Sequence, residues 1–269
     1  MSSATKTLEL LNYFTPSRAE IGLSELCRLA KRDKGTTHRH LQDLEKSGFV
    51  EQNPRTREYR LGPAVLQLAQ TREATVPRKA GAEFALRRLA NASGETTHVS
   101  VLSGAVLHTL DSYEPPQHSI RVIIDVSRFP LHATASGLSV LAFGQPELVD
   151  AACENLKHFT NRTASSRVEL EDEIAIAREC GFGHADRTFE DEVYSVAIPL
   201  FDQTGHVAGA ISVASVASRI TEDAELRIRG KLIEAGREIT RNWGGTIPAE
   251  LEACWASTTK NSQVLDTAI

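Results

Sequence analysis

The sequence has few of the features that mark membrane or secreted proteins. No apolar run approaches the 18 residues that a membrane-spanning helix needs. The segment from Met1 to Leu11, with Lys6 and Glu9, lacks the apolar core of a signal peptide. We therefore expect a cytoplasmic protein with no membrane partner.

Cysteine is also scarce. The four cysteines, Cys27, Cys153, Cys180 and Cys254, are far apart and form no Cys-x-x-Cys pair. Disulfide frameworks and cysteine zinc sites need closely spaced or paired cysteines. We expect buried free thiols and no bound metal.

Motifs of common catalytic sites are absent too. The sequence has no Gly-x-Ser-x-Gly, His-Glu-x-x-His, P-loop or Gly-x-Gly-x-x-Gly motif, and its nine histidines show no metal-ligand pairing at helical spacing. We therefore expect no catalytic residues and no cofactor. Two alternatives stay open: an enzyme, because His, Ser and Asp occur together after residue 80, and a redox-sensing GAF protein. For the second, Cys153 and Cys180 are the candidates, although nothing recognisable in the sequence lowers a thiol pKa.

The sequence does contain material for two domains of opposite charge. Its 269 residues, 41% hydrophobic and 24% charged, amount to about two typical globular domains. Residues 1–75 hold 12 Lys and Arg against 9 Asp and Glu, whereas the remainder holds 18 against 26. A basic region attached to an acidic body suits a phosphate-binding domain. We place the boundary near residues 73–77, where helical patterning stops before a proline.

Residues 1–61 have the pattern of a winged helix-turn-helix. The spacing predicts a first helix over residues 4–14, closed by Pro16, and a second, short helix capped by Ser24. The apolar positions of the first helix are Leu8, Leu11 and Phe14.

The third predicted helix, residues 34–47, has two contrasting faces and ends at Gly48. Its inward positions are Thr37, Leu41 and Leu44, and its outward positions are Gly35, Thr36, Arg39, Gln42, Asp43 and Lys46. A guanidinium reads guanine or phosphate, an amide reads adenine and a threonine methyl contacts thymine, so this face is typical of a recognition helix.

A basic hairpin follows this helix. Two short β-prone runs flank the turn Asn53-Pro54-Arg55-Thr56, which favours a wing whose Arg55 and Arg57 contact phosphates. The candidate DNA-binding residues are Lys34, Gly35, Thr36, Thr37, Arg39, His40, Gln42, Arg55 and Arg57.

These residues resemble a known family. The segment LSELCRLAKRDKGTTHRHLQDLEKSGFVEQNPRTREYRLGP, residues 23–63, is similar to the winged helix-turn-helix of the isocitrate lyase regulator (IclR) family, and GPAVLQLAQTR, residues 62–72, resembles its linker helix. Gly35 departs from the family pattern, which usually has serine there. The resemblance implies a transcriptional regulator that binds double-stranded DNA.

The region after residue 80 predicts an antiparallel sheet with flanking helices. Helices are expected over residues 80–89, from residue 135 through Phe143, over 168–180 and over 221–242, the last carrying Leu226, Leu232, Ile233 and Ile239. Strands are expected around the turns Ser103-Gly104 and Asp202-Gln203-Thr204-Gly205. The fold class is α+β.

Small residues and hydroxyls gather on one face of the two strands at the second turn. Strand alternation puts Ser195 and Ala197 on one side, with Tyr194 facing away, and the neighbouring strand presents Ser212 likewise. Together with the helix opening at Ala135-Ser136-Gly137, whose first N–H groups have no intrahelical partner, this face predicts a seat for a carboxylate.

This region resembles the GAF-like effector domain of the same family. The resemblance rests on LHATASGLSVLA, residues 131–142, and on the run from GFGHADRTF to ASRIT, residues 181–221. It implies that a small acid contacts the amides near Ser136 and Gly137 and the side chains of Ser195 and Ser212. The candidate effector-binding residues are Ala135, Ser136, Gly137, Asp186, Ser195 and Ser212.

The expected organisation is therefore a DNA-binding domain, a linker helix, an effector-binding domain and an appendage. The appendage has a Ser/Thr-rich end and is expected to be partly disordered. The corresponding ranges are 1–61, 62–78, 79–243 and 244–269.

The sequence favours a small 2-oxo acid such as glyoxylate or pyruvate as the effector, because aromatic residues near the expected site are few. An aromatic acid is the alternative. Two copies of a weakly charged head bind DNA better than one, so we expect a homodimer or a dimer of dimers on a palindromic operator.

Overall fold

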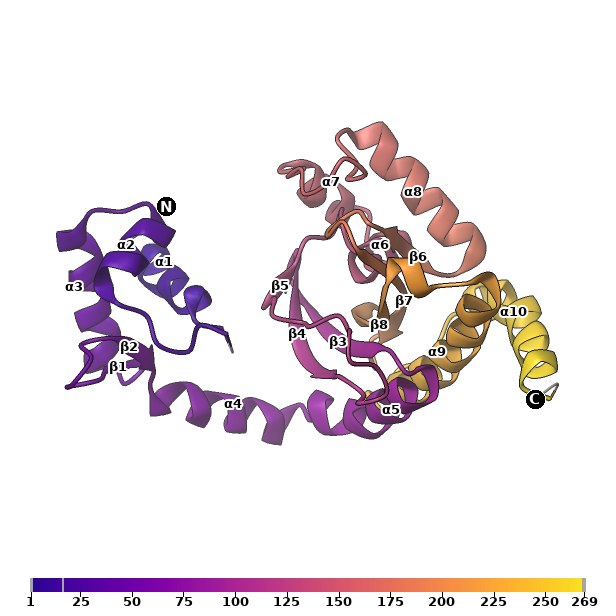
Figure 1. The fold of residues 1–269 in the computed structure, drawn as a ribbon, viewed down its shortest axis with the longest axis horizontal. Helices are drawn as coiled ribbons and strands as arrows, with labels where there is room; N and C mark the ends of the chain where they lie inside the picture. The colour runs from indigo at the N-terminus through magenta and orange to yellow at the C-terminus, as the bar shows by residue number, and fades with distance from the viewer. Residues whose placement is uncertain (1, 16, 268–269) are drawn as a thin grey trace. The chain divides into compact units, whose positions relative to one another are not determined.

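The computed structural model describes residues 2–15 and 17–267, and the chain divides into two compact units (Figure 1). The N-terminal unit is Met1–Pro77 with Asp125–Ser127, and the C-terminal unit is Arg78–Ile124 with Arg128–Ile269. Each unit has its own buried apolar core.

The N-terminal unit begins with a helix that changes pitch. Helix α1, Ser3–Glu9, continues into a short 3₁₀ helix, η1, Leu10–Tyr13. Leu10 is fully buried whereas Leu8 is 55% exposed, so the expectation that Leu8 belongs to the core was wrong. A 3₁₀ helix has about three residues per turn instead of 3.6, and this change turns a different side chain inward. The expected stop at Pro16 lies outside the described residues.

Helix α2, Leu23–Ala30, begins earlier than expected. Its N-cap is Gly22, so the assignment of Ser24 as the cap was wrong. The helix ends at Lys31, which adopts the left-handed conformation (φ +51°).

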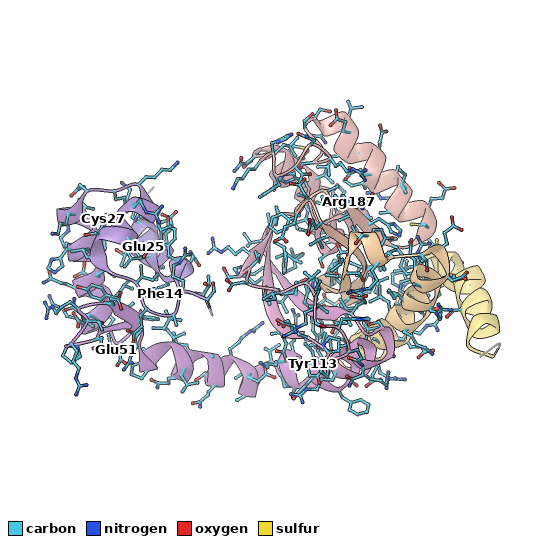
Figure 2. The ribbon with its side chains drawn as sticks, viewed as in Figure 1. Phe14, Glu25, Cys27, Glu51, Tyr113 and Arg187 are labelled. Carbon is cyan, nitrogen blue, oxygen red and sulfur yellow. The ribbon has the colours of Figure 1, made fainter. Side chains whose placement is uncertain are left out.

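Helix α3, Lys34–Lys46, confirms the sequence pattern. The Asp33 carboxylate caps it by accepting the Thr36 N–H at 2.8 Å, and Gly48, just past its end, has φ +73°. Its inward residues Thr37, Leu41 and Leu44 are buried. The core that they join also contains Leu10, Phe14 (labelled in Figure 2), Ile21, Leu26, Val50 and Tyr59.

The wing is the predicted antiparallel hairpin, with strands β1, Val50–Gln52, and β2, Tyr59–Leu61. The Asn53 side chain accepts the N–H of Arg55 at 3.0 Å, which shapes the turn. Helix α4, Pro63–Thr75, follows, and none of its residues is buried.

The C-terminal unit is built on one six-stranded antiparallel sheet of order β5-β4-β3-β8-β7-β6, which confirms the α+β class. The hairpins at Gly104 (φ +58°) and Gly205 (φ +76°) are where the sequence predicted them. The strands are β3, Thr96–Ser103; β4, Val106–Tyr113; β5, Arg128–Phe129; β6, Gly183–Asp186; β7, Val193–Phe201; and β8, Val207–Val216.

Helices cover both faces of this sheet (Figure 1). On one face, α5 and α9 pack on the central strands; Ile198 of β7, for example, meets Gly236 of α9. On the other face, α6 packs on β6, β7 and β8, with α8 outside it. These helices and α7 are α5, Arg78–Ser93; α6, Ala135–Phe143; α7, Glu147–Cys153; α8, Arg167–Cys180; and α9, Glu222–Asn242.

Part of the C-terminal appendage forms helix α10, Ala249–Thr267, which packs on α9 and α8. Trp255 is fully buried, and its indole N–H donates to the Gly181 carbonyl at 2.8 Å. Leu251 is buried beside it, and Arg237 of α9 pairs with Glu252. Burial of a large aromatic ring supplies the apolar contact that the Ser/Thr-rich composition did not suggest.

Candidate functional site

The outward face of α3 forms the first part of the site. Arg39, Gln42 and Lys46 are exposed, and within the described chain Arg39 forms no ion pair. Hydrogen bonds from the backbone and hydroxyl of Thr36 lower the pKa of Asp33, so the helix cap stays ionised. Lys34 and Gly35 of the first turn are exposed and Thr36 is half-buried. This helix therefore presents donors and a guanidinium that can reach base edges and phosphates.

Two candidate DNA-binding residues lie on the wrong face of α3. Thr37 is fully buried and donates its hydroxyl proton to the Asp33 carbonyl at 2.9 Å. His40 is 2% exposed, and its ring Nδ1 shares a hydrogen bond with the Thr7 hydroxyl of α1. Their assignment as DNA-binding side chains was wrong, because three and six residues after Lys34 the helical repeat returns toward the core.

The wing forms the second part. Arg55 and Arg57 are exposed at its tip, and Arg57 has φ +62°. By contrast, Arg60 is paired with Glu51 at 2.6 Å and Glu20 at 3.4 Å. The tip arginines are therefore the wing cations whose charge is available to phosphates.

In the C-terminal unit, the register brings the small residues of three strands onto one face of the sheet. Ala197 of β7 lies opposite Ser212 of β8, and Ser212 lies opposite His98 of β3. Ser195, half-buried near the start of β7, shares this face. Tyr194 faces away, as predicted, toward Glu225 of α9.

Helix α6 begins over this face and is buried along almost its whole length. The Thr134 hydroxyl caps it by accepting the Gly137 N–H at 3.1 Å. A Cβ at Gly137 would lie 2.2 Å from the Leu131 carbonyl oxygen, and one at Gly183 of β6 would lie 2.2 Å from that of Ala135. Both glycines are therefore required for the close approach of this helix start to its surroundings.

A buried histidine, His98 of β3, lies next to the start of α6. His98 Nε2 is 3.1 Å from the Ser136 hydroxyl oxygen, and its ring stacks on Phe129 with centroids 4.6 Å apart. Burial lowers the pKa of His98 to about 4, so the ring is neutral at physiological pH. Among the described residues, neither His98 Nδ1 nor the Ser212 hydroxyl has a hydrogen-bond partner, although both are buried. Such unpaired polar atoms are costly unless something binds them.

The candidate residue Asp186 is not part of this arrangement. Its neighbour Ala185 shares the face of Ser195, whereas Asp186 points to the other side of β6. Its carboxylate pairs with Arg162 and, at 2.7 Å, with Arg187, the residue labelled in Figure 2. Asp186 therefore lies outside this sheet face, and its role as an effector contact stays a prediction.

A hollow of about 410 Å³ lies next to Leu131, which leads into α6. Phe129, the ring that stacks on His98, is in its wall together with Phe159 and Phe189, whose centroids are 4.8 Å apart. Arg128 and Lys157 add positive charge. Phe129 and Phe159 had no signal in the sequence pattern, because both lie outside the predicted elements.

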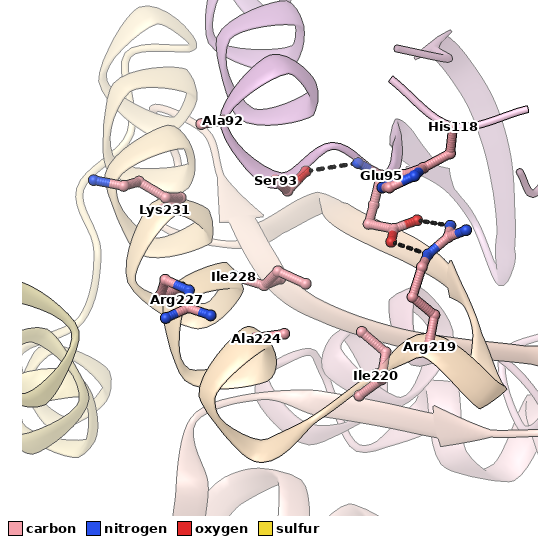
Figure 3. Close-up of a pocket in the computed structure, with 10 residues that line it drawn as sticks. All are labelled: Ala92, Ser93, Glu95, His118, Arg219, Ile220, Ala224, Arg227, Ile228 and Lys231. Atoms are coloured by element: carbon pink, nitrogen blue, oxygen red, sulfur yellow. Dashed lines mark hydrogen bonds and ion pairs between the residues drawn. The ribbon is translucent and has the colours of Figure 1, made fainter. Parts of the chain in front are cut away.

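A second hollow, of about 300 Å³, lies between the end of α5 and the start of α9 (Figure 3). Its buried carboxylate, Glu95, is held by Arg219 through two hydrogen bonds of 2.8 and 2.7 Å, so these two charges cancel. Among the described side chains that line it, no nitrogen or oxygen atom is both buried and without a hydrogen-bond partner.

Neither a metal centre nor a membrane helix is evident in the described part of the chain. No three or more His, Cys, Asp and Glu side chains gather there in a way that could hold a metal ion. No helix there is both long enough and apolar enough to cross a membrane.

Both units match known domains. Residues 3–54 match the IclR helix-turn-helix domain, and residues 76–241 match the C-terminal domain of bacterial IclR transcriptional regulators. The HTH-type transcriptional regulator XynR of Escherichia coli strain K12 is 29% identical over 248 residues, which is 91% of this chain and 98% of XynR. The transcriptional repressor IclR of the same organism is 28% identical over 250 residues, 91% of each chain.

Solved structures are also similar to this chain. A putative IclR transcriptional regulator from Silicibacter sp. TM1040 is 40% identical, with a TM-score of 0.80 over 93% of this chain and 99% of its own. An IclR homologue from Microbacterium hydrocarbonoxydans, solved with 4-hydroxybenzoate, is 22% identical and shares the fold, with a TM-score of 0.71 over 90% of this chain and 99% of its own. The chain therefore belongs to the IclR family and is a DNA-binding transcriptional regulator with an effector-binding C-terminal domain, rather than an enzyme.

Proposed function

We propose that a small carboxylic acid, with a 2-oxo acid such as glyoxylate or pyruvate as the first choice, binds at the start of α6 and changes the affinity of the protein for its operator. The observation that carries this proposal is the pair of buried, unpartnered polar atoms, His98 Nδ1 and the Ser212 hydroxyl, beside Ser136. Neutral His98 offers an N–H donor from whichever ring nitrogen carries the proton. A carboxylate accepts several hydrogen bonds and is favoured at a helix N-terminus.

Ser136 links the two parts of this arrangement. When its hydroxyl donates to His98 Nε2, the ring proton lies on Nδ1, which then faces an incoming acceptor. The 2-oxo group of a short acid would bring a second acceptor for the Ser212 hydroxyl. Binding then satisfies groups that are unpaired in the free protein.

Isothermal titration calorimetry of the full chain with glyoxylate, pyruvate and acetate tests the proposal. Ser212→Ala and His98→Gln are expected to weaken binding about tenfold or more, since each removes a hydrogen-bonding group. Ser100→Ala is the matched control, because its hydroxyl is already satisfied by the Ala210 carbonyl at 3.3 Å. Absence of heat with all three acids would contradict the proposal for small acids.

An aromatic acid is the second candidate, favoured by the hollow lined by Phe129, Phe159 and Phe189. The homologue solved with 4-hydroxybenzoate supports the same possibility. Titration with 4-hydroxybenzoate, with Phe159→Ala as the variant, separates the two. If only 4-hydroxybenzoate gives heat of binding, and this heat is lost in Phe159→Ala, the effector is an aromatic acid and not a 2-oxo acid.

We propose that α3 reads the operator and that two copies of the chain do so together. Helix α4 supports the dimer: it buries no residue within its own unit and exposes Leu66 by 62% and Leu68 by 56%. Such apolar side chains are commonly covered by a second subunit. Two linked heads raise the effective concentration at paired half-sites, which suits a palindromic operator.

Sedimentation of the full chain at micromolar concentration tests this association. Wild-type protein is expected as a dimer or a dimer of dimers, and Leu66→Glu with Leu68→Glu is expected to shift it toward smaller species and to weaken operator binding. Val168→Glu is the control, since this α8 residue is 68% exposed outside the linker. An unchanged mass in the double variant would show that α4 does not form the interface.

A further inference from the structure

A cysteine and a histidine from neighbouring elements meet in the C-terminal unit, away from the proposed effector site. Cys180 ends α8, and His184 lies in β6, with Cys180 Sγ 3.9 Å from His184 Nδ1. All four cysteines are half-buried rather than buried, contrary to the expectation from the sequence. Among the residues described, no other cysteine has a titratable side chain within hydrogen-bond distance.

The surroundings of His184 place a proton on the nitrogen that faces the sulfur. Arg229 Nη2 of α9 lies 2.8 Å from His184 Nε2. A guanidinium only donates hydrogen bonds, so Nε2 is the acceptor and the ring proton of neutral His184 is on Nδ1. The protonated ring also carries a proton there. In both states Nδ1–H donates toward Cys180 Sγ.

Other charged groups fix this arrangement. Arg229 pairs with Glu225 in the same helix and stacks over Phe182 with its guanidinium carbon 5.2 Å from the ring centroid. Glu225 Oε1 is also 3.5 Å from His184 Nε2. Burial raises the pKa of Tyr194 on β7, helped by its hydrogen bond to Glu225, so Tyr194 stays neutral behind the cluster. The Cys180 thiol therefore faces the His184 N–H with the Arg229 guanidinium behind it, and its sulfur also lies 3.3 Å from the Phe182 carbonyl oxygen and 3.8 Å from that of Ala177.

These contacts favour the thiolate of Cys180. Cys180 lies at the C-terminal end of α8, where the helix dipole opposes negative charge, so the helix cannot be the stabilising element. Burial raises the pKa of the Cys180 thiol, but the hydrogen bonds with His184 and Phe182 and the charges of His184 and Arg229 outweigh it, and the pKa is lowered. Burial lowers the pKa of His184, but the hydrogen bond with Cys180 and, once Nε2 is protonated, the bond to the Glu225 carboxylate outweigh that effect, and the pKa is raised.

We propose that Cys180 is a modification site, a nucleophilic thiol that hydrogen peroxide and soft electrophiles attack in preference to Cys27, Cys153 and Cys254. With peroxide, the thiolate sulfur forms a bond to one oxygen as the O–O bond breaks. The sulfur is oxidised to a sulfenic acid, and the other oxygen leaves as hydroxide, which takes a proton from solvent and becomes water. Low thiolate pKa and partial exposure are the properties that make such cysteines selective.

Alkylation of the reduced full chain with limiting iodoacetamide tests the proposal, with each cysteine quantified by peptide mass spectrometry between pH 5.5 and 9.5. The rate at pH 9.5, where thiols ionise, reports exposure, so the ratio of the rate at pH 7 to that at pH 9.5 isolates the thiolate fraction. We expect Cys180 to have the highest ratio and a midpoint below the ordinary value of about 8.5. A ratio no higher than that of Cys254 would overturn the proposal.

Variants assign the effect to its cause. His184→Gln is expected to raise the midpoint of Cys180 and to slow its alkylation at pH 7 about tenfold, and Arg229→Gln to do so less. His206→Gln is the matched control, because this histidine is exposed in the β7–β8 turn and its ring hydrogen-bonds with Thr204 at 3.0 Å, far from any cysteine in the sequence. If circular dichroism shows that His184→Gln misfolds, the wild-type pH profile and Arg229→Gln decide. An unchanged profile in a folded His184→Gln protein would contradict the proposed role of the imidazole.

The oxidant arm uses hydrogen peroxide followed by dimedone, which captures sulfenic acids. A dimedone adduct on Cys180, formed faster than on the other three cysteines, is the expected result. If Cys180 is alkylated preferentially but forms no dimedone adduct, the proposed reaction with peroxide is wrong, whereas the proposal that Cys180 is a nucleophilic thiol stands. Calorimetry with the small acids is unaffected by either outcome, so this proposal and the proposed function fail separately.

Discussion

The two units use opposite kinds of surface. The N-terminal unit presents exposed side chains, with Arg39 and Gln42 on α3 and Arg55 on the wing. The C-terminal unit offers His98 and Ser212, which are neutral and buried. An exposed cation attracts a polyanion over a Debye length and is screened by salt. A buried donor without a partner acts only at hydrogen-bond distance. It selects among ligands because a ligand without a matching acceptor leaves the donor unpaired. One unit is therefore suited to binding a long charged polymer and the other to recognising a small molecule.

The largest effect on stability is expected at a buried aromatic residue of the C-terminal unit. Trp255→Ala removes a fully buried ring between α10 and Gly181, and it is expected to lower the free energy of unfolding by about 3–5 kcal/mol. Urea denaturation measures this loss. Val168→Ala, at a site 68% exposed, is the control and is expected to change it by less than about 0.5 kcal/mol. Equal, small changes in both variants would show that α10 is not part of the core.

The next largest effect is expected in the pH dependence of stability, which depends on His98 being buried and neutral in the folded protein. The unfolded chain has His98 with an ordinary pKa of 6.5, whereas in the folded protein the pKa is about 4. The unfolded state then binds more protons in this window, so stability is lost as the pH falls from about 6.5 toward 4, by about 3 kcal/mol in all.

Chemical denaturation across that pH range, with wild-type protein and His98→Gln, measures this dependence. The difference between the two curves isolates His98, because Glu173, whose pKa burial raises to about 7, contributes with the opposite sign to both. If the two proteins have the same pH dependence, His98 is not neutral and buried in solution.

The third prediction concerns the exposed face of α3. Arg39→Ala is expected to weaken binding to the specific operator by about 1–3 kcal/mol if the guanidinium reads a guanine, with less effect on random DNA. Gel-shift titrations on the two DNAs measure the difference. Arg167→Ala is a matched control in the other unit, where this arginine pairs with Asp150 and Glu171. Equal losses of binding free energy on both DNAs would show that Arg39 does not recognise a base.

The smallest effect is expected at the wing tip. Arg55→Ala is expected to weaken binding to all sequences alike and to reduce the slope of log K against log salt by about one, because one phosphate contact is lost. Repeating the titrations between 50 and 200 mM salt checks this prediction. A change confined to the specific operator would instead make the wing a reader of sequence.

The sequence predicted the structure best where the conformation or burial of a residue depends on a single helix or turn. The inward set of α3, Leu41 and Leu44, follows from the helical repeat, and the turns at Gly104 and Gly205 follow from local backbone chemistry. Where a second element intervenes, the pattern was misleading. His40, for example, is buried against the Thr7 hydroxyl of α1 instead of facing outward.

By itself, the sequence determined the family, the α+β class and the exposed cations of the DNA-binding surface, because these depend on local periodicity and on charges that stay in water. The tertiary structure alone decided that His98 joins Ser136 and Ser212 beneath α6, and that Cys180 faces His184. These residues are separated by tens of positions or lie on different elements. Their pKa values and unpaired atoms arise from burial, which is a property of the packed fold and of no single segment.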